Sequence, residues 1–505
     1  MSAEKPALQG RLMRCHGWQQ EASQRMLANT IALEASRGFD PSDAGAAQRR
    51  DCYPAIAQTL EQLGNGETAM IHNGVPESIF LTHISEPRVL VVGPAPMLES
   101  HGSLAHTEQL GLILHGEMAA GNWMLTSSEE MLLGAYAVFE SAARRHFGGS
   151  LSGRLVVSGG FGRIGGVLPL AATLQGAAFL GVEVDAGRIK ERVRAGYCDY
   201  CVNSLDEALR ILKIAVRQKQ AISVGLEGNC AEIIPELASR GVLPDLLTDQ
   251  TGKVGPATGY VPSGLSAETA SRLKSSAPQE FERLCRASAA RQMAAMLELQ
   301  KLGAKVFEYG YGSAETTPEH FGIKDAAVIP DLVSAYLAPL MREEGAPIRW
   351  AALSGDSGDI HRIDTMAAEM FSEDTLTGRW IRCRRKHLRF QGLPARAGWM
   401  RKDVQAEFGM RINDLVRHGK LKAPVVLGRE ESGESLRKPS AGDHGISDAN
   451  ASTTSALLAV ANGASWISIQ KDNDGGVVAV GRAVVASGEA PMDERIARVF
   501  GAPPE

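Results

Sequence analysis

A glycine-rich turn between two apolar runs constrains the fold of this chain more than any other feature. The strand-like run 154–158 is followed by Gly160, Gly162 and Gly165, and a second apolar run, 177–184, comes after a helical stretch. Gly160 permits a tight turn, Gly162 lets the backbone approach a pyrophosphate, and Gly165 lets the helix pack close to the strand. Strand, turn, helix and strand in this order predict a unit that binds a dinucleotide. A tight turn without a ligand is the alternative.

The end of the second apolar run indicates which dinucleotide is bound. Glu183 follows the glycines by about twenty residues, where a carboxylate accepts hydrogen bonds from a ribose diol. Amides at the N-terminus of the intervening helix would face the phosphates. A carboxylate at this point favours a free 2′-hydroxyl and repels a 2′-phosphate. Arg188 could in principle accept that phosphate, although stacking or pairing near the adenosine suits it better, so we expect NAD rather than NADP.

Length and charge limit the remaining classes of protein. A chain of 505 residues is too long for one ordinary core, so two or three domains are expected. Its 53 basic and 58 acidic residues give a net charge of −5. The chain therefore lacks the excess of basic residues that is typical of proteins that bind nucleic acid. No run of about eighteen apolar residues predicts a membrane span. The N-terminus lacks the apolar segment of a signal peptide, so a cytoplasmic location is expected.

The seven cysteines do not suggest a disulfide framework, because the chain is long and their number is odd. Cys198 and Cys201 form a C-x-x-C pair. A zinc site usually needs a second pair or nearby histidines, and a thioredoxin-type motif needs a different strand–helix setting. Ordinary, partly buried thiols are the preferred interpretation, and no metal is expected.

Strand and helix patterns alternate from about residue 150 to 335, which predicts a parallel sheet covered by helices. Ligands of such sheets bind at the carboxyl ends of the strands. Polar or Gly-rich segments at 227–230, 249–252 and 309–312 follow predicted strands, so we expect them to form one wall of a cleft, although each could be a simple turn. The pattern also predicts a long helical region over roughly 266–302 and a long polar loop over 430–448.

Blocks of residues outside the glycine turn point to a family. The chain resembles urocanate hydratase (urocanase) nearly end to end, in segments 14–22, 146–149, 169–173, 182–185, 248–251, 259–262 and 390–396. The resemblance implies an α/β fold in which a Rossmann-type NAD-binding domain, 136–335, is inserted into a core domain made from both chain ends, 1–135 and 336–505. It also implies a homodimer.

The resemblance further implies an unusual use of the cofactor. Urocanases hold NAD+ tightly, and its nicotinamide acts as an electrophile rather than as a hydride acceptor. The imidazole ring of urocanate adds to it, water attacks a ring carbon, and imidazolone propionate leaves after the side chain is protonated. The cofactor performs the difficult step, while the protein supplies placement and electrostatic field.

By position, the family's NAD contacts fall around the glycine turn and the predicted strand ends. With the glycines of the turn they are Gly160, Gly162, Arg163, Ile164, Gly165, Glu183, Arg188, Asn229, Cys230, Gln250, Thr251, Gly252, Val254, Tyr260, Val261, Tyr309 and Gly476. The family's substrate-carboxylate arginine corresponds to Arg349, and a guanidinium suits a planar carboxylate because it engages both oxygens at once. A structural salt bridge is the alternative for Arg349.

The chain departs from the family pattern where a small imidazole would be contacted. Gly398 stands in place of the customary active-site cysteine, and polar motifs are exchanged at 115–118, 251–256, 309–312, 429–431 and 470–474. A site built to hydrogen-bond one ring rejects a ring with different donors and acceptors. We therefore expect a modified urocanate as the substrate, such as the thiourocanate or S-methylthiourocanate of ergothioneine degradation, or an N-methylated urocanate. Gly398 could create room for the ring substituent.

Hydration moves protons to the side chain and from water, so acidic residues are candidates for proton transfer. These candidates are Glu117, Glu430, Glu431 and Asp356, each with a surface acid as the alternative. Lys253 and Tyr311 are further candidates for substrate contact. The competing functions are authentic urocanate hydratase, an ordinary NAD-dependent dehydrogenase, and an inactive relative that senses a ligand.

Overall fold

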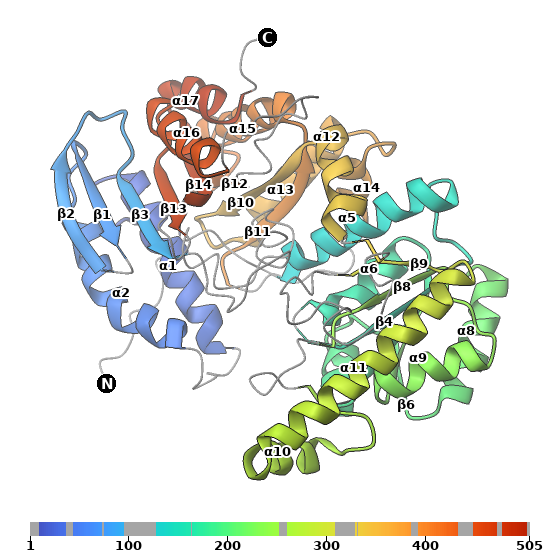
Figure 1. Ribbon diagram of the computed structural model, residues 1–505. Helices are drawn as coiled ribbons and strands as arrows, with labels where there is room; N and C mark the ends of the chain where they lie inside the picture. Colours follow the sequence, from blue (N-terminus) through green and yellow to red (C-terminus); the bar gives the residue numbers. More distant parts are fainter. Residues whose placement is uncertain are drawn as a thin grey trace. The chain divides into compact units, whose positions relative to one another are not determined.

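A computed structural model of the chain divides into two compact units (Figure 1), and each is described by itself. One unit takes the middle of the chain, Met131–Leu340, and the other joins Met341–Glu505 to the N-terminal part. The structure describes residues 10–36, 44–72, 75–94, 128–162, 164–251, 260–308, 329–330, 332–384, 392–432, 448–471 and 477–501. Among these residues, no helix is both long enough and apolar enough to cross a membrane.

The middle unit is a parallel six-stranded sheet in the order β6-β7-β5-β4-β8-β9. This is the parallel sheet with helical connections that the sequence predicts. Its strands are β4 (Leu155–Gly159), β5 (Ala178–Glu183), β6 (Tyr200–Val202), β7 (Ile222–Glu227), β8 (Leu246–Asp249) and β9 (Lys305–Val306). Its helical segments are η1 (Gly165–Val167), α6 (Leu168–Leu174), α7 (Ala186–Arg194), α8 (Leu205–Gln218), α9 (Cys230–Ser239), α10 (Ala267–Ser276), α11 (Pro278–Lys301) and η3 (Val333–Leu337), with α5 (Ser128–Phe147) entering the unit and α12 (Ala338–Glu344) leaving it.

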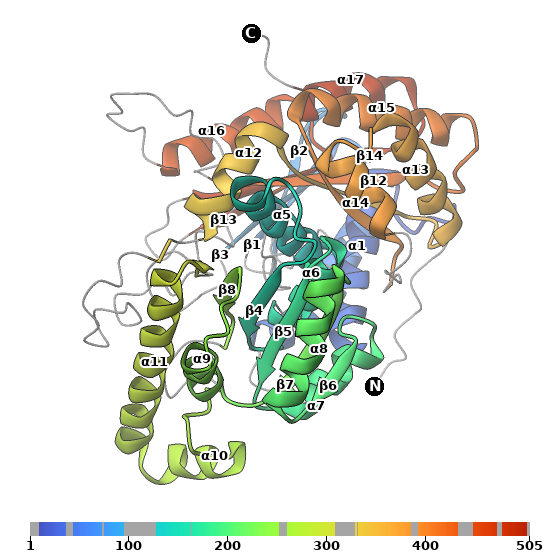
Figure 2. The ribbon, with the colours of Figure 1, turned by 90° about the vertical axis from the view of Figure 1, so that its right-hand side faces the viewer.

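The central strands of this sheet are mostly apolar because helices cover both of its faces. All residues of β4 and β5 are buried. In α8, Leu205, Leu209 and Leu212 repeat at helical spacing and are buried toward the sheet. Figure 2 shows α8 along β5 and β7, and α9 beside α11, in agreement with the helix contacts of the unit. This packing fixes the carboxyl ends of β4, β5, β7 and β8, where the candidate site lies.

The second unit is built on an eight-stranded mixed sheet in the order β11-β10-β12-β14-β13-β3-β1-β2. Its strands are β1 (Glu67–His72), β2 (Val75–Leu81), β3 (Val89–Pro94), β10 (Ala346–Ala352), β11 (Ala395–Met400), β12 (Val425–Ser432), β13 (Trp466–Lys471) and β14 (Val477–Ala486). Its helices are α1 (Trp18–Ser36), α2 (Ala44–Gln62), α13 (Ser357–Met370), α14 (Leu376–Arg384), α15 (Lys402–Arg417), α16 (Asp448–Ala461) and α17 (Ala490–Phe500). The parallel pairing of β13 with β3 joins the two chain ends in one sheet.

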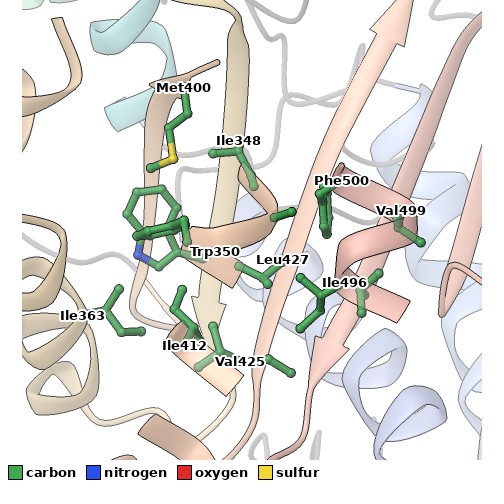
Figure 3. Packing of buried hydrophobic residues seen from close by; sticks show 14 of the residues in the cluster. Ile348, Trp350, Ile363, Met400, Ile412, Val425, Leu427, Ile496, Val499 and Phe500 are labelled. Carbon is green, nitrogen blue, oxygen red and sulfur yellow. The ribbon is translucent and has the colours of Figure 1, made fainter. Parts of the chain in front are cut away.

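Each face of the mixed sheet carries its own apolar core, because successive side chains of a strand point to opposite faces. Ile348 and Trp350 of β10 and Leu427 of β12 pack on one face with Ile496 and Phe500 of α17, as Figure 3 shows. On the other face, intervening residues such as Ala351, Val426 and Ala483 pack with residues of α1 and α2. Alternate residues of β10, β11 and β12 therefore lie on opposite faces of the sheet, and the position along the strand decides the face.

The structure confirms the helical region at 266–302 and divides it, whereas the loop expected from residue 430 is wrong at its start. Residues 266–302 form two helices rather than one, because Pro278 begins a new helix and the residue before a proline avoids helical geometry; Ala277 has φ −145° and ψ 72°. Residues 430–432 are not loop but the end of β12, where Glu430 pairs with Gly481 of β14. Polar character hid this strand end, since charged residues rarely occupy a buried sheet.

Candidate functional site

A cavity of about 240 Å³ lies at the carboxyl ends of the strands of the parallel sheet. Segments that follow β4, β5, β7 and β8 contribute to its wall, as expected for the ligand position in open parallel sheets. Its lining residues are Gly160, Gly162, Val182, Glu183, Val184, Arg188, Gly228, Asn229, Cys230, Gln250, Thr251, Tyr260, Val261 and Gln292.

The glycine turn is required by backbone packing. Gly160 has φ +81°, and a Cβ atom at this residue would collide with the carbonyl oxygen of Gln250. A Cβ atom at Gly165 would collide with the carbonyl oxygen of Gly160, so the helical turn can lie against the strand end only without a side chain. At Gly162 a Cβ atom would meet nothing within 4 Å. The turn therefore presents bare backbone to the cavity at Gly162, and Arg192 Nη2 holds that residue's carbonyl oxygen at 3.1 Å.

Glu183 is buried at the end of β5 with both carboxylate oxygens already oriented. Oε2 accepts a hydrogen bond from Phe161 N at 2.7 Å, and Oε1 accepts one from Asp185 N at 3.1 Å. Arg188 lies beside it, with Nη1 at 3.7 Å from Oε2, and its side chain is half exposed. A carboxylate fixed by two backbone amides keeps lone pairs for a ribose diol. Asp185 Oδ1 caps α7 by accepting from Gly187 N at 2.8 Å.

The opposite wall is a loop that several hydrogen bonds hold in place. Asn229 Oδ1 caps α9 by accepting from Ala231 N at 2.9 Å, while its Nδ2 donates to Val261 O at 2.9 Å. Farther along the loop, Ser263 N donates to Ser288 Oγ of α11 at 2.9 Å. The wall formed by Tyr260 and Val261 is therefore tied to both α9 and α11.

Polar atoms at this site lack partners inside the described part of the chain. They are the hydroxyl of Tyr260, Nε2 of Gln250 and, in the strand just before, Oγ1 of Thr248. Burial raises the pKa of Tyr260 well above its usual range, so the phenol stays protonated and can donate. Unpaired buried polar groups are costly unless a ligand or water satisfies them. A nucleotide, rich in donors and acceptors, fits these orphaned groups together with the bare Gly162 backbone and the fixed Glu183 carboxylate.

The cysteines near the sheet do not have the properties of reactive thiols. Burial raises the pKa of Cys230 well above its usual range, and a Cβ atom at Gly159 would approach its Sγ within 2.6 Å, so the thiol fills the space beneath the turn. Burial raises the pKa of Cys198 to about 11, and its Sγ donates to Tyr200 O at 3.4 Å. A reactive cysteine has a lowered pKa, so both residues behave as packing thiols here.

A second group of buried polar residues lies on the mixed sheet, and we call Arg349, Glu430 and Gln470 the polar cluster. Gln470 Nε2 donates to Glu430 Oε1 at 2.9 Å, and Arg349 Nη1 lies 4.0 Å from Glu430 Oε2. The three residues come from β10, its neighbour β12, and β13, which β14 separates from β12, and by register they share one face of the sheet. Trp399 of β11 shares that face by register, and its buried indole Nε1 finds no partner within the described segments.

The structure does not bring Gly398 to this cluster. Gly398 pairs with Ile348 across the β10–β11 ladder, whereas Arg349 pairs with Ala397, so Gly398 and Arg349 lie on opposite faces of the sheet. A Cβ atom at Gly398 would lie 3.1 Å from Cη2 of Trp350, so the indole occupies the space that a side chain would take. The room for a ring substituent that the sequence suggested at this glycine is therefore filled by the core.

Asp356 has structural contacts. Its Oδ1 caps α13 by accepting from Gly358 N at 2.7 Å, and its Oδ2 accepts from Lys422 Nζ. The hydrogen bond from Lys422, followed by the one from Gly358, lowers the pKa of Asp356. These contacts correspond to the surface-acid alternative for this residue.

The structure brings most of the expected nucleotide contacts together, while several other expected residues lie outside the described ranges. Those that line the cavity together are Gly160, Gly162, Glu183, Arg188, Asn229, Cys230, Gln250, Thr251, Tyr260 and Val261, while Ile164 and Gly165 belong to the turn behind them. Those outside the described residues are Glu117, Arg163, Gly252, Lys253, Val254, Tyr309, Tyr311 and Gly476, and of Glu431 only the backbone, in β12, is described. Sequence reasoning did not single out Val182, Val184, Gly228 or Gln292 as contacts, although Gly228 lies in the segment 227–230 that it expected in the cleft wall. The first three flank predicted contacts, and Gln292 is detectable only as a polar residue on the buried face of a helix.

Comparison with known protein families accounts for nearly the whole chain. The Urocanase N-terminal domain matches residues 6–124, the Urocanase Rossmann-like domain matches residues 128–336, and the Urocanase C-terminal domain matches residues 339–505. The Rossmann-like match covers the parallel sheet and its cavity, and the other two matches cover the two chain ends that share the mixed sheet. The chain belongs to the urocanase family.

Proposed function

We propose that the protein is an NAD+-dependent hydratase that adds water to a urocanate-type imidazole acrylate whose ring is modified, with thiourocanate and S-methylthiourocanate as the preferred candidates. Membership of the urocanase family implies an enzyme of the hydro-lyase class with urocanate hydratase-type activity. The identity of the ring and the role of the cofactor go beyond that membership and are argued from the two sites.

The cavity of the parallel sheet has the donor set that a dinucleotide requires. The backbone at Gly162 receives the pyrophosphate, because no side chain stands between it and the cavity. Glu183 receives the ribose diol with its spare lone pairs and disfavours a 2′-phosphate. Tyr260 donates its phenolic proton to the ligand, which satisfies an otherwise orphaned buried group. Bound NAD+ would supply an electrophilic pyridinium that withdraws electron density from the substrate ring.

The polar cluster has the groups that an acrylate substrate requires. Arg349 offers a planar fork that can engage both oxygens of a carboxylate. Glu430 can hold or accept a proton during hydration, and Gln470 orients it by donating to Oε1. The buried indole N–H of Trp399 is a further donor on the same face. Burial of these residues keeps bulk water from the reacting groups.

The hydrogen bond between Glu430 and Gln470 carries the proposal of a modified ring. Both residues stand where the chain departs from the family pattern, and they contact each other beside Arg349, which the family pattern retains. Glu430 and Gln470 both differ from the family pattern and contact each other, while Arg349 beside them is retained. This combination fits a substrate that has the carboxylate of urocanate but a different ring. Gly398 does not contribute to this argument, because Trp350 fills the space next to it.

Turnover of a panel of acrylates tests the proposal. The purified full-length protein is mixed with urocanate, thiourocanate, S-methylthiourocanate and N-methylurocanate, and loss of the conjugated acrylate absorbance is followed together with the absorbance of reduced nicotinamide. We expect a sulfur-bearing substrate to have the highest kcat/KM and no reduced cofactor to accumulate. Faster hydration of plain urocanate than of every modified form would reject the modified ring. Formation of reduced cofactor in proportion to product would instead identify a dehydrogenase.

Authentic urocanate hydratase is the second candidate, and the retained position of Arg349 on β10 supports it as well, since either substrate presents the same carboxylate. We also infer from the family resemblance that the protein is a homodimer, which sedimentation of the purified protein would test.

A further inference from the structure

Helix α11 contributes one polar side chain to the cavity, and no sequence motif points to it. Gln292 lines the cavity although the residue as a whole is only 5% exposed. No hydrogen bond among the described residues uses its carboxamide. Because neither amide atom is fully enclosed by protein, the carboxamide is open to the cavity and available to a ligand there.

The helix face around Gln292 is otherwise satisfied. Ser288 lies one turn earlier on the same face, and its hydroxyl donates to Leu284 O at 2.8 Å and accepts from Ser263 N at 2.9 Å. Ser288 therefore anchors the loop that carries Tyr260 and Val261. Gln292, one turn farther along, faces the cavity instead. The contrast between the two residues separates a structural polar group from one that is available to a ligand.

The positions of the other lining residues indicate which part of a dinucleotide lies near Gln292. Gly162 marks the pyrophosphate and Glu183 marks the adenosine ribose. Val184 continues from β5, and Gly228 and Asn229 follow β7, the strand that pairs with β5 on the side away from β4. Gln292 comes from α11, which packs against α9, the helix that begins directly after Gly228 and Asn229. The part of the cavity near Gln292 therefore lies on the adenosine side of the pyrophosphate.

We propose, on the basis of the proposed NAD+ function, that the carboxamide of Gln292 binds the hydrogen-bonding edge of the adenine base. A carboxamide places a donor and an acceptor side by side, which matches the exocyclic amino group of adenine and the adjacent N7, whereas hypoxanthine presents two acceptors on that edge. Phosphates need donors only, and the ribose diol is served by Glu183, so the base is the part of the ligand that uses both functions of a glutamine. Gln292 is a binding and specificity residue, separate from the reacting groups.

Nucleotide binding to the full-length protein, after removal of bound nucleotide, tests this assignment. Gln292→Leu should weaken binding of NAD+ and of ADP-ribose in parallel, by roughly 5- to 100-fold, as expected for loss of a paired base contact. Binding of nicotinamide mononucleotide should not change. Gln279→Leu is the matched control, because Gln279 is exposed on the same helix and does not line the cavity; it should bind all three ligands as the wild type does.

A base analogue provides the readout that a purely structural role would not change. The wild type should prefer NAD+ to its hypoxanthine analogue, in which an acceptor replaces the amino group, and Gln292→Leu should lose that preference. Unchanged ADP-ribose affinity or an unchanged base preference in Gln292→Leu would overturn the assignment. If that variant does not fold, Gln292→Glu serves instead. A carboxylate only accepts hydrogen bonds, so this variant should prefer NAD+ over the hypoxanthine analogue more strongly than the wild type does. A weaker preference for NAD+ would overturn the proposal. Failure of the wild type to bind either NAD+ or ADP-ribose would instead reject the proposed function itself.

Discussion

Restoring a cysteine at position 398 should destabilise the protein without creating an active-site thiol. The Cβ atom of any side chain there would lie 3.1 Å from Cη2 and 3.3 Å from Cζ3 of Trp350, and 3.3 Å from Cε of Met400. Trp350 is fully buried between Ile348, Phe408 and their neighbours, so its ring has no solvent-filled space into which it can move. The new side chain must therefore push against a closed core.

The magnitude follows from the balance between crowding and chain entropy. Carbon atoms pack best at about 3.5–4.0 Å, so three contacts at 3.1–3.3 Å require a shift of the ring. Overpacking of this kind costs about 1–3 kcal/mol, while replacing a strand glycine returns about 0.5–1 kcal/mol. We expect Gly398→Cys to lower the free energy of unfolding by about 0.5–2 kcal/mol, with Gly398→Ala affected less because it lacks the sulfur atom.

Denaturant unfolding, thiol titration and turnover together test this reasoning. The new thiol should react with a thiol reagent only after unfolding, and urocanate hydration should not increase. A double-mutant cycle of Gly398→Cys with Trp350→Phe is the matched control, because a smaller ring should relieve the crowding. The double variant should be more stable than the sum of the two single effects predicts, by about 0.5–3 kcal/mol. A stable Gly398→Cys variant with an additional accessible thiol, or one that gains urocanate turnover, would refute the assignment of Gly398 to the core face.

Four further predictions concern the two sites and the pH dependence of stability. Glu183→Gln should weaken NAD+ binding and narrow the preference for NAD+ over NADP+, measured as the ratio of the two dissociation constants, because a neutral amide does not repel a 2′-phosphate. Tyr260→Phe should leave the unliganded Tm unchanged, since the hydroxyl has no described partner, and should weaken NAD+ binding by about fivefold, as for one neutral hydrogen bond. Gln470→Leu should lower kcat more than it changes NAD+ affinity, because Glu430 loses the donor that orients it. Desolvation by burial lowers the pKa of His146 in the folded protein. As the pH falls, the unfolded chain therefore binds the proton first, and the folded state loses stability. The Tm difference between about pH 7.5 and about pH 5.5 should thus be smaller in His146→Gln than in the wild type.

The cavity of the parallel sheet was predictable from the sequence because much of it is encoded locally. Gly160, Gly162 and Glu183 belong to one β-α-β unit, and their spacing determines which atoms meet. The parallel pairing of the sheet followed from alternating strand and helix patterns, whereas its strand order comes from the structure. Gln292 was not predictable in this way, because it reaches the cavity through the packing of α11 against α9, which no local pattern specifies.

The mixed sheet was harder to predict because its strands come from distant parts of the chain. β2 has no fully buried residue, since it lies at the sheet edge with Ile79, Phe80 and Leu81 exposed. β12 ends in charged residues that resemble a loop, and only the register with β14 reveals that Glu430 is part of the sheet. The separation of Gly398 from Arg349 depends on strand pairing in the same way, because a shift of one residue would exchange the two faces.

The polar cluster is difficult to explain as a stabilising feature. Arg349 and Glu430 are both buried, and their closest charged atoms are 4.0 Å apart, too far for a hydrogen bond. A buried ion pair is weak evidence for stability, because well-packed apolar residues usually stabilise such a position as well or better. Glu430 nevertheless stands beside Arg349, with Gln470 donating to one carboxylate oxygen. Carboxylate binding by Arg349 and proton transfer by Glu430, as the proposed function requires, would give this arrangement a role besides stability.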